Sequence, residues 1–366
     1  MDLRSATPEE LQLYMKEIGE PAFRGSQIFD WLHNKKCMEI SEMTNLGLNL
    51  RKRLEAAAQL HPLRRITVQQ SKVDGTRKYL FALHDSQMVE SVWMEYKHGN
   101  SVCISTQVGC KMGCVFCASG LDGFTRQLTA DEMLQQVYLM ERDNGKRVSN
   151  IVMMGTGEPL DNYDNSVRFI RLISHPQGSH ISQRNITMST CGLAPQIRKL
   201  AQEKLQITLA LSLHAPNDEA RRRLMPIANT YPLEAVLAAC REYFEVTGRR
   251  ISFEYSLVRG CNDSLKQADE LAALLAGFPC HINLIPVNPV VEKGYQQTFR
   301  KDVEAFKNQL EKKHFNVTIR RELGADIDGA CGQLRKKKLD ETIEQPVPCN
   351  TAVPKGFQQA EKTERR

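Results

Sequence analysis

Strand-like and helix-like segments alternate along this chain from residue 101 onward. Short runs rich in β-branched residues are separated by longer stretches whose apolar residues recur at helical spacing. The strand-like runs cover residues 102–108, 150–154, 185–189, 207–213, 251–257, 281–287 and 316–321. The helix-like stretches cover residues 129–143, 163–174, 194–203, 232–246, 264–276 and 299–313. Capping boxes are predicted for two of these helices, formed by Thr129 with Glu132 and by Ser264 with Gln267.

This alternation limits the fold more than any other feature of the sequence. Six strand–helix units in succession predict an α/β architecture in which a parallel sheet curls into a partial or full barrel. Several strands are rich in Ile, Val and Leu, so we expect both faces of the sheet to be covered. Barrels of this kind bind ligands at the carboxyl ends of their strands, and a functional site is expected there.

The remaining segments of the chain follow other patterns. Residues 1–60 have apolar residues at helical spacing and predict a small helical accessory domain. Residues 61–100 contain strand-like runs separated by turn signals and predict a β-rich connector. The core barrel then covers residues 101–338. Residues 339–366 have few apolar groups and predict a disordered tail.

Composition excludes some classes of protein. The chain has 366 residues, of which 41% are hydrophobic and 25% charged, an ordinary globular balance. No apolar run approaches the roughly 18–20 residues of a membrane span, and the N-terminus lacks the apolar segment of a secretory signal. We therefore expect a cytoplasmic protein without a membrane partner. The net charge is +6, and clumps of basic residues such as Arg221–Arg223 are predicted to contact phosphates.

Eleven cysteines are many for such a chain, because disulfide scaffolds belong to small secreted domains. Cys110, Cys114 and Cys117 form a C-x3-C-x2-C motif in a loop after the first predicted barrel strand. Three close thiolates suit either zinc or an iron–sulfur cluster. Structural zinc usually takes four protein ligands, whereas three ligands on a four-iron cluster leave one iron open for a substrate.

This motif, with the aromatic Phe116 before its last cysteine, resembles the signature of the radical S-adenosylmethionine (SAM) superfamily. The resemblance implies a partial (β/α)6 barrel. It also implies one 4Fe-4S cluster per chain, held by Cys110, Cys114 and Cys117. SAM is then expected to bind the open iron and to be cleaved reductively to a 5′-deoxyadenosyl radical.

Further segments resemble the RlmN/Cfr family of RNA methyltransferases within that superfamily. They are CISTQVGCKMGCVFCASG, MMGTGEPLDN, NITMSTCGLAP, LSLHAPND, LMPIANTYPL, HINLIPVNP and RRELGADIDGACGQL. The resemblance implies methylation of C2 of adenine 2503 in 23S rRNA and of adenine 37 in tRNA. Two SAM molecules per turnover and a flavodoxin- or ferredoxin-like reductant are implied as well, and we expect the chain to act as a monomer.

The resemblance also assigns roles to single residues. Glu90 is implied to remove the C2 proton, and Cys331 to become S-methylated and carry the methyl group through a transient covalent adduct with RNA. Cys103 is implied to attack the Cys331 sulfur, which releases the RNA and leaves a disulfide. The residues implied to contact SAM are Gly157, Glu158, Ser189, Ser212, Leu213, His214 and Asn288.

Two alternatives stay open. The first is a Cfr-type enzyme that methylates C8 of adenine in rRNA with the same cysteines. Pro159 resembles the C2 enzymes, since the C8 type tends to have Ala at this position. The second is a non-catalytic, zinc-dependent RNA-binding protein in which Cys110, Cys114 and Cys117 hold zinc.

Overall fold

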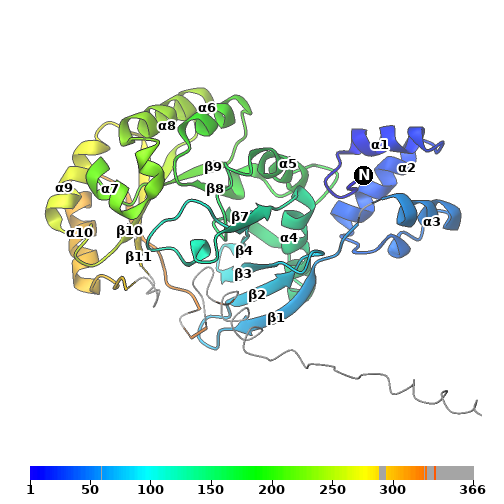
Figure 1. Ribbon diagram of the computed structural model, residues 1–366, viewed down its shortest axis with the longest axis horizontal. Coiled ribbons are helices and arrows are strands. Elements are labelled where there is room, and N and C mark those ends of the chain that lie inside the picture. The colour runs from blue at the N-terminus through cyan, green and yellow to red at the C-terminus, as the bar shows by residue number, and fades with distance from the viewer. Residues whose placement is uncertain (59, 288–293, 325, 328–333, 335–366) are drawn as a thin grey trace, which may run out of the picture.

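The computed structural model describes residues 1–58, 60–287, 294–324, 326–327 and 334 (Figure 1). The predicted tail, Asn288 and Cys331 lie outside the described residues. The main sheet has ten strands in the order β1-β2-β3-β4-β7-β8-β9-β10-β11-β12. Their bounds are β1 (Arg64–Gln70), β2 (Arg77–Ala82), β3 (Met88–Tyr96), β4 (Gly99–Cys103), β7 (Val148–Met153), β8 (Ile186–Thr190), β9 (Thr208–Ser212), β10 (Ile251–Leu257), β11 (Cys280–Pro286) and β12 (Val317–Ile319).

The sheet changes character at β4. Strands β1 to β4 pair antiparallel, whereas every pair from β4 to β12 is parallel. Strands β1 and β12 are the two edges of the sheet, so the barrel is open. This confirms the predicted α/β partial barrel.

Helices follow the parallel strands and lie along the outside of the sheet (Figure 1). Both predicted capping boxes are present, at Thr129 and at Ser264. The bounds are α4 (Ala130–Asn144), α5 (Tyr163–Ile173), α6 (Ala194–Gln202), α7 (Asp218–Leu224), α8 (Leu233–Thr247), α9 (Leu265–Leu274) and α10 (Arg300–Lys312). No helix in the described part of the chain combines the length and apolar character needed to cross a bilayer.

The first barrel strand was predicted wrongly as residues 102–108. The strand β4 instead begins at Gly99, in a hairpin with β3, and ends at Cys103. The chain then leaves the sheet because the Thr106 and Gln107 amides donate to the Thr156 carbonyl. Residues from Gln107 form β5 (Gln107–Gly109), which pairs with β6 (Phe124–Gln127) in a separate two-stranded sheet.

The sequence predicts that both faces of the sheet are covered, but only one of the two faces is apolar. Ile186 and Met188 of β8 are fully buried on the face covered by helices, and Phe253 of β10 is buried likewise. The alternate residues on the other face, here called the inner face, are polar. They include Thr187, Ser189, Ser212, Ser252, Glu254, Asn283 and Thr318, which the strand register aligns.

The N-terminal region is helical, as predicted, and packs against the barrel beside α4 and α5 (Figure 1). It contains α1 (Pro8–Glu17), α2 (Phe23–Phe29), the π-helix η1 (Asp30–Asn34), the 3-10 helix η2 (Ile40–Glu42) and α3 (Leu48–Ala57). A buried ion pair joins Arg4 to Asp131 of α4 at 2.6 Å. His33 Nδ1 lies 3.0 Å from the Tyr138 hydroxyl of α4. These buried polar contacts fix the position of the N-terminal helices on the barrel.

Candidate functional site

A cavity of about 240 Å³ lies at the carboxyl ends of the parallel strands. We call it the cysteine cavity, since Cys110, Cys114 and Cys117 contribute to its wall. The other lining residues come from the segment between β5 and β6 that carries these cysteines, from β7 to β12 and from the loops that follow those strands. They are Met112, Phe116, Ser119, Met153, Met154, Gly155, Gly157, Glu158, Pro159, Ser189, Cys191, Ser212, His214, Met225, Glu254, Ser256, Ile285 and Arg320.

The cysteine loop is held between the strands of the β5–β6 hairpin. The Cys110 amide donates to the Gly123 carbonyl at 2.9 Å. Gly109 has φ 75°, and a Cβ there would lie 1.9 Å from the Gly123 oxygen, so only glycine allows this closure. The Val115 amide also donates to the Leu224 carbonyl of α7 at 3.0 Å. The loop is therefore fixed at both its base and its tip.

The chemistry of the three thiols fits an iron–sulfur cluster. Burial raises the pKa of Cys110 to about 11 and raises that of Cys114 further, so thiolates at these positions need a bound cation. A four-iron cluster takes each thiolate on a different iron, so the three cysteines of this loop can hold such a cluster.

Glu158 holds the loop after β7 to its neighbours. Its carboxylate accepts from the Leu160 amide at 3.0 Å and from the Cys191 amide at 2.8 Å. Burial raises the pKa of Glu158. Gly157 has φ 113°, and a Cβ there would approach Gln107 to 2.7 Å. Because there is no room for a side chain at Gly157, this residue can contact a ligand only through its backbone N–H and C=O groups.

The predicted residues at the end of β9 have different roles. Ser212 and Ser189 point their hydroxyls toward each other, with oxygens 3.3 Å apart. Leu213 is fully buried in the core, so only its backbone is available for a ligand. His214 lies in the left-handed region at φ 56°, and its ring contacts the edge of Phe116, with centroids 4.9 Å apart.

His214 is held as a neutral ring. Its Nδ1 accepts from the Ser256 amide at 2.9 Å. Burial lowers its pKa to about 3. Because Nδ1 accepts a hydrogen bond, the ring proton belongs on Nε2. His214 therefore offers a donor at the cysteine cavity without adding a charge.

Arg221 corrects a sequence-based expectation. The segment Arg221–Arg223 was predicted as a loop contacting phosphates, but it belongs to α7, and Arg221 is fully buried. Its guanidinium donates to the carbonyls of Cys191, Ser212 and Leu213 at 2.6, 3.3 and 3.2 Å. Arg221 therefore ties the ends of β8 and β9 together and is not available to RNA.

Glu254 was missed from the sequence, although it lines the cysteine cavity from β10. It accepts from Asn283 Nδ2 at 2.8 Å and from the Ser252 hydroxyl at 2.9 Å. Burial raises its pKa. A carboxylate inside an otherwise apolar and hydroxyl-rich strand was a signal that could have identified it.

Glu90 and Cys103 do not line this cavity but lie on the same inner face. In the strand register Val92 opposes Cys103, and Cys103 opposes Val152. Side chains two residues apart point to the same face, so Glu90 shares this face with Cys103. The Ser105 hydroxyl donates to the Glu90 carbonyl at 2.7 Å and accepts from the Thr156 amide, which connects β3 to the loop after β7.

Lys78 of β2 is a second residue that the sequence did not reveal. Its ammonium nitrogen lies 3.1 Å from a carboxylate oxygen of Glu90, and both side chains are buried. A lysine in the strand-like run RKYLFAL was a weak signal, since lysine side chains usually face solvent. The predicted methyl carrier Cys331 and the predicted SAM contact Asn288 lie outside the described residues.

Comparisons with known proteins agree with this architecture. Residues 104–272 match the model of the radical SAM superfamily. Residues 1–60 match the ribosomal RNA large subunit methyltransferase N-terminal domain.

Full-length relatives are similar throughout. A probable dual-specificity RNA methyltransferase RlmN from Lachnospira eligens is 56% identical over 343 residues, which are 94% of this chain and 98% of the relative. The protein of the same description from Lachnoclostridium phytofermentans is 56% identical over 95% of this chain and 98% of its own length. A crystal structure of a radical SAM methyltransferase from Sphaerobacter thermophilus superposes with a TM-score of 0.87 at 42% identity, covering 91% of this chain and 98% of that one.

Proposed function

Because the chain belongs to the RlmN family of radical SAM RNA methyltransferases, we propose that it methylates C2 of adenine 2503 in 23S rRNA and of adenine 37 in tRNA. The observation that carries this proposal is the inner face of the barrel. Along one face it presents a cysteine cavity suited to a cluster and SAM, and beyond it a buried carboxylate and a thiol, Glu90 and Cys103.

The superfamily implies a 4Fe-4S cluster and SAM, and we propose one cluster per chain, held by Cys110, Cys114 and Cys117. When bound, the cluster supplies the electron that cleaves SAM to a carbon radical able to abstract hydrogen from an unactivated methyl group. The residues around the cavity orient the cofactor. Ser189, Ser212 and the Nε2 donor of His214 offer neutral hydrogen bonds, and Gly157 offers its backbone.

We assign proton transfer to Glu90, whose carboxylate accepts the C2 proton of adenine once carbon has added there. Lys78 places a positive charge beside this carboxylate at 3.1 Å. Cys331 carries the methyl group as a thioether, and the Cys103 thiolate attacks that sulfur. Radical addition leaves one electron in excess on the ring, which returns to the redox partner as the C2 proton is lost. The S–C bond to the RNA adduct then breaks, its electron pair and a proton from solvent complete the methyl group on the base, and an S–S bond forms between Cys103 and Cys331, which an external dithiol must reduce before the next turnover.

Other expectations belong to the same proposal. We propose that residues 1–60 form an accessory domain that binds RNA and that the chain acts as a monomer. A flavodoxin- or ferredoxin-like protein is proposed as the reductant, and two SAM molecules are consumed per turnover.

The covalent adduct gives a direct test. In Cys103→Ala, the thiol that resolves the adduct is absent, so a protein–RNA species should accumulate and persist on denaturing gels. Cys261→Ala, which changes an exposed thiol, is the matched control and should release methylated RNA normally. Absence of a trapped species with active wild-type enzyme would refute the assigned order of steps.

The alternatives are separated by two further measurements. Mass spectrometry of digested RNA distinguishes 2-methyladenosine from the 8-methyl isomer of a Cfr-type enzyme. Anaerobic purification gives a brown protein with broad visible absorbance if a cluster is bound. A colourless protein with stoichiometric zinc would support the non-catalytic RNA-binding alternative.

A further inference from the structure

The positive charge of Arg221 is buried without an opposing carboxylate. Its side chain is fully buried, and in the described part of the chain it donates only to carbonyl oxygens, while Nη1 has no hydrogen-bond partner. The other fully buried cations among the described residues, Arg4 and Lys78, each contact a carboxylate. Because buried charges are normally paired, the unpaired charge of Arg221 calls for a further explanation.

Arg221 lies behind the wall of the cysteine cavity. Two of its three carbonyl partners belong to residues that line this cavity. One turn further along α7, the Leu224 carbonyl accepts from the Val115 amide, which is next to Cys114 in the cysteine loop. Burial raises the pKa of Cys114, and the charge of Arg221 acts on this thiol in the opposite direction. The guanidinium is therefore close enough to act on a group that the cysteines hold.

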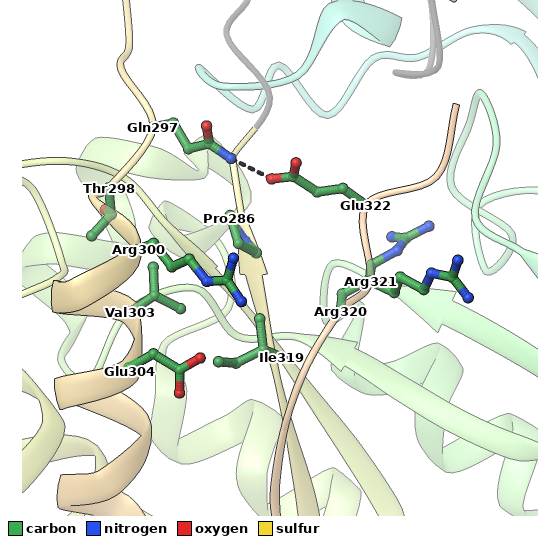
Figure 2. A pocket seen from close by; sticks show the side chains of 10 residues that line it. All are labelled: Pro286, Gln297, Thr298, Arg300, Val303, Glu304, Ile319, Arg320, Arg321 and Glu322. Carbon is green, nitrogen blue, oxygen red and sulfur yellow. Dashed lines mark hydrogen bonds between the residues drawn. The ribbon is translucent and has the colours of Figure 1, made fainter. Parts of the chain in front are cut away.

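The charged side chains that line the cysteine cavity do not replace Arg221. Glu158 and Glu254 are acids, and burial raises the pKa of both, which favours their neutral forms. Arg320 is exposed, and Figure 2, which shows a neighbouring cavity, has its side chain extending away from Arg300 of α10. Water and salt screen an exposed charge much more than a buried one. Arg221 therefore supplies the positive potential that reaches the cavity through the protein interior.

A fixed cation at this position matters for electron transfer. An iron–sulfur cluster held by three thiolates is anionic, and reduction adds one more negative charge to it. A nearby positive charge in a surrounding of low dielectric constant stabilises the reduced form more than the oxidised form. The reduction potential of such clusters depends on the net charge around them and on their exposure to solvent. The charge of Arg221 is therefore expected to make reduction easier.

We propose that Arg221 raises the reduction potential of the bound 4Fe-4S cluster and so favours its reduction by one electron from the flavodoxin- or ferredoxin-like donor. This inference rests on the proposed function, because it requires a cluster at Cys110, Cys114 and Cys117. The donor is oxidised as the cluster is reduced, and no covalent bond of the protein changes. Arg221 has no proton to exchange in this step, so it acts as a fixed charge behind the cavity wall.

The test measures the midpoint reduction potential of the full-length, cluster-containing enzyme by a redox titration followed with electron paramagnetic resonance. Arg221→Gln removes the charge but keeps a side chain that donates hydrogen bonds. We expect its equilibrium constant for reduction to fall about tenfold, which for one electron is a shift of about 59 mV to more negative potential. Arg221→Lys keeps the charge and should stay near the wild-type potential. Arg222→Gln, which removes the exposed charge beside it, is the matched control and should leave the potential unchanged.

A second variant offsets the charge of Arg221 without changing Arg221 itself. Cys240 of α8 is fully buried, and burial raises the pKa of its thiol to about 12 against the opposing charge of Arg221. Cys240→Asp introduces a carboxylate near the guanidinium and should shift the potential in the same direction as Arg221→Gln. Cys240→Asn, which is neutral and of the same size as aspartate, is the control and should not shift it.

Two results would overturn the inference. One is an unchanged potential in Arg221→Gln. The other is an equal shift in Arg221→Gln and Arg221→Lys, which would assign the effect to the packing of the β8 and β9 ends. If Arg221→Gln binds no cluster, the difference between Cys240→Asp and Cys240→Asn decides, and equal potentials in these two variants would refute the role of the charge. The proposed function fails separately, if wild-type enzyme binds no cluster or binds one that does not cleave SAM.

Discussion

The inner face of the barrel holds two buried glutamates in contrasting surroundings. Glu90, in the antiparallel half of the sheet, lies 3.1 Å from the ammonium of a fully buried lysine. Glu254, in the parallel half, accepts hydrogen bonds from neutral groups of Asn283 and Ser252, and burial raises its pKa. A glutamate on the inner face therefore contacts a charged ammonium in the antiparallel half and neutral hydrogen-bond donors in the parallel half.

The difference follows the chemistry assigned to each half. Neutral donors in the parallel half suit a cavity in which a cationic sulfonium cofactor and a cluster bring their own charges. In our proposal the antiparallel half binds no such cofactor. Glu90, which lies there, must accept a proton from the adenine ring. The ammonium of Lys78 gives that carboxylate an electrostatic partner within the protein.

The largest effect is expected from breaking the ion pair. Lys78→Met removes the cation beside Glu90 and leaves a buried carboxylate, which should cost about 3–5 kcal/mol in the free energy of unfolding. The double variant Lys78→Met/Glu90→Gln removes both charges and should recover most of that loss. Denaturant unfolding of the two variants measures the coupling. If the losses in the free energy of unfolding simply added in the double variant, Lys78 and Glu90 would not be coupled, and the contrast with Glu254 would not hold.

A smaller effect is expected in the parallel half. Arg221→Met leaves three buried carbonyl oxygens without their guanidinium donor and should cost about 2–3 kcal/mol. Cluster content should fall too, because α7 and the ends of β8 and β9 lie against the cysteine loop. Arg222→Met, the exposed neighbour on the same helix, is the control and should stay within about 0.5 kcal/mol of wild type. Equal stability of the two variants would contradict this assignment.

The smallest effect depends on pH. Since the pKa of Glu254 is raised in the folded chain, its protonated form is favoured there. The associated stability is present below the ordinary value near 4.5 and is lost as pH rises through the raised pKa. In that interval, the free energy of unfolding of wild type, relative to that of Glu254→Gln, should fall by up to about 1.4 kcal/mol per pH unit. The prediction is contradicted if the free energy of unfolding of wild type, relative to Glu254→Gln, increases between pH 4 and pH 8.

Local patterns predicted most elements of the barrel. The predicted strand 251–257 coincides with β10, and the capping boxes at Thr129 and Ser264 begin α4 and α9 within one residue of the predicted starts. Capping and side-chain periodicity act over a few residues, so they can be read from the chain directly. The cysteine spacing was equally local, and it located the wall of the cavity.

Errors occurred where distant contacts decide the outcome. The run 102–108 has a uniform strand-like composition, but hydrogen bonds from Thr106 and Gln107 to Thr156 pull its second half out of the sheet. Arg221 and Arg222 look alike in the sequence, yet packing against the ends of β8 and β9 buries only the first. No periodicity encodes which of two adjacent arginines will find buried carbonyls.

The sequence by itself determined the alternating strands and helices, the cysteine loop and the family to which the chain belongs. Tertiary structure alone decided that Lys78 meets Glu90 and that Glu254 faces the cysteine cavity. The reason is physical: secondary structure arises from neighbours in the chain, whereas charge pairing and cavity lining depend on strand register and helix packing between distant segments.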